Sequence, residues 1–62
     1  MAATRLSRVK DHCTVDIDVE QNGTCRIKAS GIVPQKVQTA IQQLQGTRLS
    51  PDWVMNQIMK NI

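Results

Sequence analysis

Two neighbouring stretches of the chain, residues 13–20 and 24–30, alternate between apolar and polar side chains. This period of two is typical of β-strands with one buried face, and the Asn-Gly pair between the stretches indicates a hairpin. The apolar positions that share the inner face are Cys13, Val15, Ile17, Val19, Cys25, Ile27 and Ala29. The alternation therefore predicts an antiparallel hairpin with one apolar face.

The register of this hairpin follows from keeping the apolar side chains on one face. A two-residue turn would place Val19 opposite Arg26 and mix the faces of both strands. A three-residue loop over residues 21–23 places Gly23 at the left-handed position that such loops need and sets Val19 opposite Cys25. The same register sets Ile17 opposite Ile27, Val15 opposite Ala29, Asp18 opposite Arg26 and Asp16 opposite Lys28. We therefore predict the three-residue loop, with ion pairs at the last two positions.

After the hairpin, apolar residues recur every three or four positions, which predicts two short helices. Pro34 suits the first turn of the first helix and Gly46 its end. Ser50 is the expected N-cap of the second helix, with Pro51 at its first position. The expected core comprises Val15, Ile17, Val19, Ile27, Ala29, Val37, Ile41, Leu44, Val54 and Ile58. The predicted fold class is α+β, an antiparallel hairpin followed by two short helices packed on one face.

The segment before the hairpin allows two interpretations. Residues 4–10 form either a mobile basic arm or a short edge strand, which would give the sheet a third strand. We favour the edge strand, preceded by a few loose residues. The expected organisation is an arm or edge strand over residues 1–10 and a single small α+β domain over residues 11–62.

Length and composition disfavour several classes of protein. A 62-residue chain with 40% hydrophobic residues and one aromatic side chain has room for one small domain and not for an enclosed catalytic cleft. The sequence has one His, no Tyr, no glycine-rich phosphate loop and no nucleophile and base at a recognisable spacing. We therefore expect a non-enzymatic protein without a cofactor.

The cysteines and the apolar runs indicate the compartment. The predicted register separates Cys13 from Cys25 by about 20 Å, whereas a disulfide needs Cα atoms within about 7 Å, so both are expected to be free thiols. His12 and Cys13 would point to opposite faces, and no metal site is expected. Since no apolar run is long enough for a membrane span and the start has no signal-peptide core, we expect a cytoplasmic protein without membrane contact.

Charge is distributed unevenly along the chain, whose formal net charge is +3. Residues 1–10 hold three cations and no carboxylate, residues 11–30 are mildly acidic, and residues 31–62 are again basic. The polar faces of the predicted helices are rich in Gln and Asn, whose amides can read base edges while Lys and Arg contact phosphates. The candidate nucleic-acid-binding residues are Arg5, Arg8, Lys10, Lys36, Gln38, Gln42, Arg48, Asn56, Gln57 and Lys60. This layout favours a small DNA-binding regulator that acts through a basic arm and an amide-rich helical face, although an ordinary solvated surface has a similar composition.

Trp53 falls on the polar side of the second predicted helix. It either folds back onto the first helix or the connection over residues 46–49, or it stays exposed as an anchor for a partner, since Trp is enriched in binding hot spots. The second interpretation predicts a protein–protein interaction module, an adaptor or inhibitor of a larger protein. Its candidate contacts are Trp53, Met55 and Met59. Because so small a domain buries only about 60% of its unfolded surface, a homodimer or an obligate complex is also expected.

Two families share parts of this pattern. The stretch VDIDVEQNGTCRIKASG followed by VQTAIQQLQ, roughly residues 14–45, resembles the hairpin-then-helix end of KH nucleic-acid-binding domains. Those domains grip their strand with a GxxG loop that this chain does not contain, so no binding residue carries over. A strand entering Pro34 and two helices around Gly46 resemble ribbon-helix-helix repressors, whose strand pairs with a second chain and whose major-groove contacts would fall near Lys28, Ser30 and Ile32. Neither resemblance is taken as a family assignment.

Overall fold

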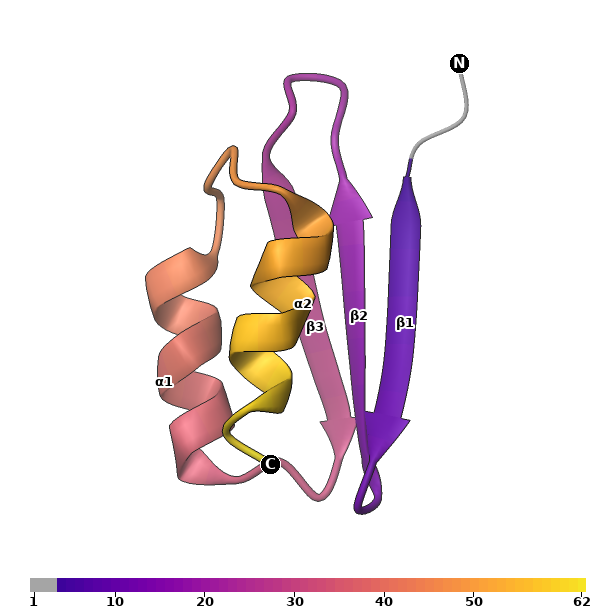
Figure 1. Cartoon of the computed structure of the whole chain (residues 1–62), viewed down its shortest axis with the longest axis vertical. Helices are drawn as coiled ribbons and strands as arrows, with labels where there is room; N and C mark the ends of the chain where they lie inside the picture. Colours follow the sequence, from indigo (N-terminus) through magenta and orange to yellow (C-terminus); the bar gives the residue numbers. More distant parts are fainter. Residues whose placement is uncertain (1–3) are drawn as a thin grey trace.

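A computed structural model of the chain describes residues 4–62. Its elements are β1 (Arg5–Lys10), β2 (Cys13–Val19), β3 (Cys25–Gly31), α1 (Gln35–Leu44) and α2 (Pro51–Met59). The strands form one antiparallel sheet in the order β1-β2-β3, and both helices lie on the same side of it (Figure 1). The predicted α+β fold class is confirmed, and the segment predicted as an edge strand is β1. The loose residues expected before it, 1–3, lie outside the described residues.

The β2–β3 hairpin has the predicted register. Val19 lies opposite Cys25, Ile17 opposite Ile27 and Val15 opposite Ala29. In the loop, the Gly23 amide donates to the Glu20 carbonyl at 2.9 Å, and Gly23 has the left-handed φ of +85° that the three-residue loop predicts. The alternation of side chains is therefore sufficient to fix this pairing.

The ion pairs on the outer face differ from those predicted. Asp18 and Arg26 are opposite one another as expected, but Arg26 Nε lies 3.9 Å from Glu20 Oε1 and Asp18 Oδ1 lies 3.5 Å from Arg5 Nε. Arg5 also approaches Asp16 at 3.9 Å, in place of the predicted Asp16–Lys28 pair. The physical reason is β1, which places Arg5 directly opposite Asp18 and within reach of both carboxylates.

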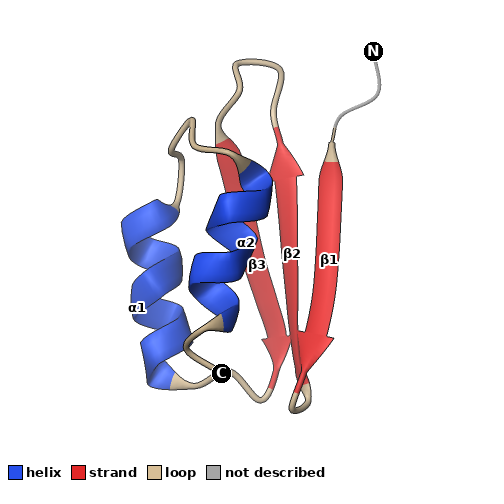
Figure 2. Cartoon of the chain, in the orientation of Figure 1, coloured by secondary structure: helices blue, strands red, loops and turns tan. Residues whose placement is uncertain are grey.

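Strand β1 joins β2 through a two-residue turn. Asp11 and His12 both have positive φ, +47° and +63°, which is the backbone of a type I′ turn. Lys10 is paired with Cys13 across it, so Leu6, Arg8 and Lys10 share the helix-covered side of the sheet. Arg5, Ser7 and Val9 lie on the outer side, which no helix covers (Figure 2).

The core lies between the sheet and the two helices. Its buried members are Cys13, Val15, Ile17, Cys25, Ile27, Val37, Val54, Met55, Ile58 and Met59. The predicted core residues Val19, Ala29, Ile41 and Leu44 are partly buried and pack against this cluster. Both cysteines are therefore core residues, and each methionine of α2 faces the sheet.

Helix starts agree with the sequence pattern to within one residue. Pro34 lies just before α1 as its N-cap residue, and its carbonyl accepts hydrogen bonds from the amides of Val37 and Gln38. Ser50 is the N-cap residue of α2 and Pro51 begins the helix. Proline suits these positions because its missing N–H has no partner in the first turn.

The first half of the outer edge of β3, at Cys25 and Ile27, is bonded to residues 45–47. Gln45 Nε2 donates to the Ile27 carbonyl at 2.9 Å, and the Ile27 amide donates to Gln45 Oε1 at 2.8 Å. The Cys25 amide donates to the Thr47 carbonyl, and the Gly46 amide donates to the Cys25 carbonyl. The residues that follow α1 thus satisfy the outward backbone groups of Cys25 and Ile27 as a fourth strand would.

Replacing Gln45 by Ala is expected to lower the free energy of unfolding by about 1–3 kcal/mol, because both Ile27 backbone groups lose their partner. Gln45→Glu should also lower it, since a carboxylate can still accept from the Ile27 amide but cannot donate to the Ile27 carbonyl. Urea denaturation measures both. Gln42→Ala removes an exposed amide of the same helix and should change stability by less than about 0.5 kcal/mol. Equal stabilities for the two Ala variants would contradict the bridging role of Gln45.

Candidate functional site

The surface feature that gathers the most candidate residues is a groove between α1 and α2. It consists of two adjoining hollows of about 260 Å³ and 190 Å³, which share Ala40, Gln43 and Asn61. We call it the interhelical groove. Its lining residues are Gln35, Lys36, Thr39, Ala40, Gln43, Leu44, Trp53, Gln57 and Asn61.

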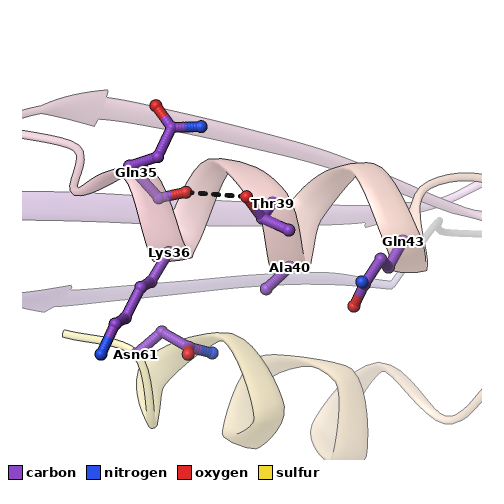
Figure 3. A pocket seen from close by; sticks show the side chains of 6 residues that line it. All are labelled: Gln35, Lys36, Thr39, Ala40, Gln43 and Asn61. Atoms are coloured by element: carbon purple, nitrogen blue, oxygen red, sulfur yellow. Dashed lines mark hydrogen bonds between the residues drawn. The ribbon is translucent and has the colours of Figure 1, made fainter.

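Helical spacing explains why these residues face one another. Lys36, Ala40 and Gln43 are four and three residues apart and form one stripe along α1, and Trp53 and Gln57 do the same along α2. Figure 3 shows Lys36, Ala40 and Gln43 in a row on the side of α1 that faces α2, with Asn61 across from Lys36. Because Ala40 has the smallest of these side chains, the middle of the groove is hollow.

Hydrogen bonds hold two of the polar side chains in place. Asn61 Nδ2 donates to the Gln57 carbonyl at 3.0 Å, and Thr39 Oγ1 donates to the Gln35 carbonyl at 3.1 Å, which Figure 3 marks. Because this bond uses only the Nδ2 group of Asn61, the side-chain oxygen of Asn61 remains available to accept a hydrogen bond from a ligand. The groove is therefore lined by amides that can both donate and accept.

The charge of the interhelical groove is positive. Lys36 is its cationic side chain, and no carboxylate is among its lining residues. Three of the acidic residues, Asp16, Asp18 and Glu20, are engaged with Arg5 and Arg26 at the sheet. An anionic ligand would thus meet no negatively charged side chain among the residues that line the groove.

Trp53 stands at one end of this groove. Its residue is 47% exposed, and it lines the second hollow together with Ala40 and Leu44 of α1. The indole therefore lies beside the first helix and still presents surface to solvent, and its role as a partner anchor stays a prediction.

The candidate nucleic-acid-binding residues do not form one surface. Lys36 and Gln57 line the interhelical groove. Arg8 bonds Asn56 Oδ1 at 3.1 Å on the β1 side of α2, and Arg5 is paired with carboxylates on the outer face of the sheet. The others lie elsewhere on the exposed surface, as Lys10 at the end of β1, Gln38 and Gln42 on another stripe of α1, Arg48 in the connection between the helices, and Lys60 after α2.

Of the candidate partner contacts, Trp53 alone is exposed. Met55 and Met59 are 1% and 8% exposed and pack in the core, so we leave both out of the site. The sheet lies under the α2 face that carries them, and this burial removes them from any partner's reach. Thr39, Gln43 and Asn61 line the groove without having been singled out from the sequence. The four-residue spacing of Asn61 from Gln57 is the signal that could have found it.

The two thiols serve the core. Cys13 and Cys25 are fully buried and free, and Cys25 Sγ donates to the Leu49 carbonyl at 3.5 Å. Burial raises the pKa of the Cys25 thiol above its ordinary value, so the thiol stays protonated and is a poor nucleophile. Both cysteines act as small apolar residues.

The chain was compared with protein families, curated proteins and solved structures. No family model, no curated protein and no solved structure matches the chain. Within residues 4–62, the His, Cys, Asp and Glu side chains do not gather into groups of three or more that could hold a metal ion. Over the same residues, neither helix has the length and apolar character that crossing a bilayer requires.

Proposed function

We propose that this protein is a small, non-enzymatic nucleic-acid-binding regulator that holds a single-stranded segment along the interhelical groove. The observation that carries the proposal is the half-exposed Trp53 at one end of a groove lined by amides, with Lys36 as its only lining charge among the described residues. An indole face stacks on an unpaired base, and such stacking contributes about 1–3 kcal/mol per base.

The amides and the lysine supply the other contacts. Gln43, Gln57 and Asn61 offer both donors and acceptors, which match the edges of splayed bases. Lys36 contacts a phosphate and releases a condensed counterion on binding. Affinity should therefore fall as salt concentration rises.

The arrangement of the helices favours a single strand over a duplex. Helices α1 and α2 are packed against each other in one layer (Figure 1). The major groove of DNA is about 12 Å wide and admits one helix, whereas two packed helices have axes about 8–10 Å apart and are together too wide to enter. A base must also leave its stack before it can lie on Trp53.

Trp53 gives the test a built-in signal, because it is the only Trp of a chain that has no Tyr. Single-stranded DNA and RNA oligonucleotides should quench its fluorescence more strongly than a duplex of equal length, and the affinity should fall between about 50 and 200 mM salt. If none of these nucleic acids binds at about 50 mM salt, the proposal is overturned. If the chain instead binds a protein tightly, and this binding tolerates salt and depends on Trp53, the interaction-module alternative is established.

Trp53→Ala is expected to weaken oligonucleotide binding by about 5- to 150-fold, the equivalent of one stacked base. Anisotropy of a labelled oligonucleotide measures this, and Trp53→Phe, which keeps an aromatic face, should recover part of the affinity. Circular dichroism should show an unchanged fold, because the side chain is half exposed.

Lys36→Gln should lower the slope of log affinity against log salt by about 1 in the same assay. Lys28→Gln is the matched control, since it removes the same charge from the outer face of the sheet. An equal effect of both lysine variants would show that the groove is not the binding site.

A further inference from the structure

The two edge strands of the sheet, β1 and β3, differ in how many of their outward backbone groups are hydrogen-bonded. Residues 45–47 bond the outward backbone groups of Cys25 and Ile27 in β3, whereas within residues 4–62 nothing pairs with the β1 edge. The Val19 amide donates to the Thr4 carbonyl at 2.9 Å, so the backbone groups of Thr4 and of every second residue after it face β2. Those of Arg5, Ser7 and Val9 point away from the sheet, and no hydrogen bond within residues 4–62 reaches them.

Strand β1 also lacks two of the features that normally prevent edge-to-edge pairing. It contains no proline, and its register with β2 runs without a bulge. Two of its three cations interact within the chain. Arg5 forms ion pairs with Asp16 and Asp18, and Arg8 donates a hydrogen bond to Asn56. Val9 is 65% exposed beside the unpaired backbone. The edge is thus a ready acceptor for another strand.

We propose that two copies of this chain pair through their β1 strands, antiparallel and centred on Ser7, into one continuous six-stranded sheet. This inference does not depend on nucleic-acid binding. The partner that the edge fits is a second copy because the strand is complementary to itself in this register. Ser7 lies opposite Ser7 of the partner subunit, Arg5 opposite Val9 of the partner subunit, and Leu6 opposite Arg8 of the partner subunit.

Charge and length select this register over its neighbours. A shift that centres the pairing on Arg8 places two guanidinium groups directly opposite each other, which is destabilising. A shift that centres it on Leu6 pairs fewer residues of β1, since Val9 and Lys10 then lie opposite residues outside the strand. In the register centred on Ser7, no like charges are opposite, and the aliphatic part of each Arg covers an apolar neighbour. The symmetry axis is perpendicular to the sheet, so both helical layers lie on the same side.

Ser7→Pro tests the proposal without disturbing the monomer's own ladder. The Ser7 amide points away from β2, so proline removes a donor that only the second copy would use. Sedimentation or light scattering should give twice the 6.9 kDa chain mass for the native protein and for Ser7→Thr, and the mass of one chain for Ser7→Pro. Circular dichroism of Ser7→Pro should remain that of the folded chain. A native protein that is monomeric across the concentration range, or a Ser7→Pro variant that stays dimeric, would overturn the proposal.

Cysteine substitution tests the register separately. Ser7→Cys places two thiols on opposed residues with Cα atoms about 5.5 Å apart, within disulfide range, and should give a covalent dimer on mild oxidation. Arg5→Cys places them about 13 Å apart, because the two residues are offset by four positions, and should not cross-link. The native cysteines are buried and do not interfere. Cross-linking by Arg5→Cys and not by Ser7→Cys would contradict this register.

Discussion

Gly31→Ala is expected to lower the free energy of unfolding by about 3 kcal/mol or more. Gly31 has φ of +85°, where an L side chain costs about 1–2 kcal/mol. A Cβ there would also overlap the carbonyl of His12, which lies over the end of β3 and accepts a hydrogen bond from the Ile32 amide. Moving the backbone of Gly31 or of His12 away would break the hydrogen bond between Ile32 and His12. The ends of β2 and β3 would then separate.

The other glycines separate the two contributions. Gly23 and Gly46 also have positive φ, but a Cβ at either position has open space around it. Gly23→Ala and Gly46→Ala should therefore show the conformational cost alone, about 1–2 kcal/mol. Urea denaturation of the three variants gives the comparison. A Gly31→Ala variant no less stable than these two would mean that the close approach to His12 is not a constraint.

Ile17→Ala is expected to lower the free energy of unfolding by about 2–5 kcal/mol. Ile17 is fully buried in the central strand, where it lies between Leu6 of β1 and Ile27 of β3. A 62-residue domain has a total stability of roughly 3–9 kcal/mol at about 0.05–0.15 kcal/mol per residue. A large unfolded fraction at room temperature is therefore the expected result, measured by circular dichroism and urea titration.

Ile32→Ala makes the same chemical change at a position that is 68% exposed. It should alter stability by less than about 0.5 kcal/mol. If the two isoleucine variants were equally stable, the helices would not be packed on the inner face of the sheet as described.

The sheet could be predicted from the sequence further than is usual for so short a chain. One criterion, that no apolar residue of the hairpin faces outward, chose between two loop lengths and fixed every pair of β2 and β3. The ion pairs could not be predicted in the same way. They depend on β1, whose alternation is too weak to give a register, since Leu6 and Val9 fall on opposite faces.

The candidate site was less predictable from the sequence than the sheet, for a related reason. Lys36 and Asn61 are far apart in the sequence and meet only because α1 and α2 run antiparallel side by side. The type of each candidate residue was visible, but not which of them share a face. Met55 and Met59 show the same limit, because a helical apolar stripe identifies a buried face without saying whether a sheet or a partner covers it.

The contact between Arg8 and Asn56 joins the first strand to the last helix, 48 residues apart in the chain. The meander of β1, β2 and β3 precedes both helices in the chain, and the part of its apolar face over β1 and β2 has no cover until α2 has left the ribosome. Folding of this domain therefore completes only after α2 has been synthesised, and until then part of the nascent sheet exposes apolar surface that favours aggregation.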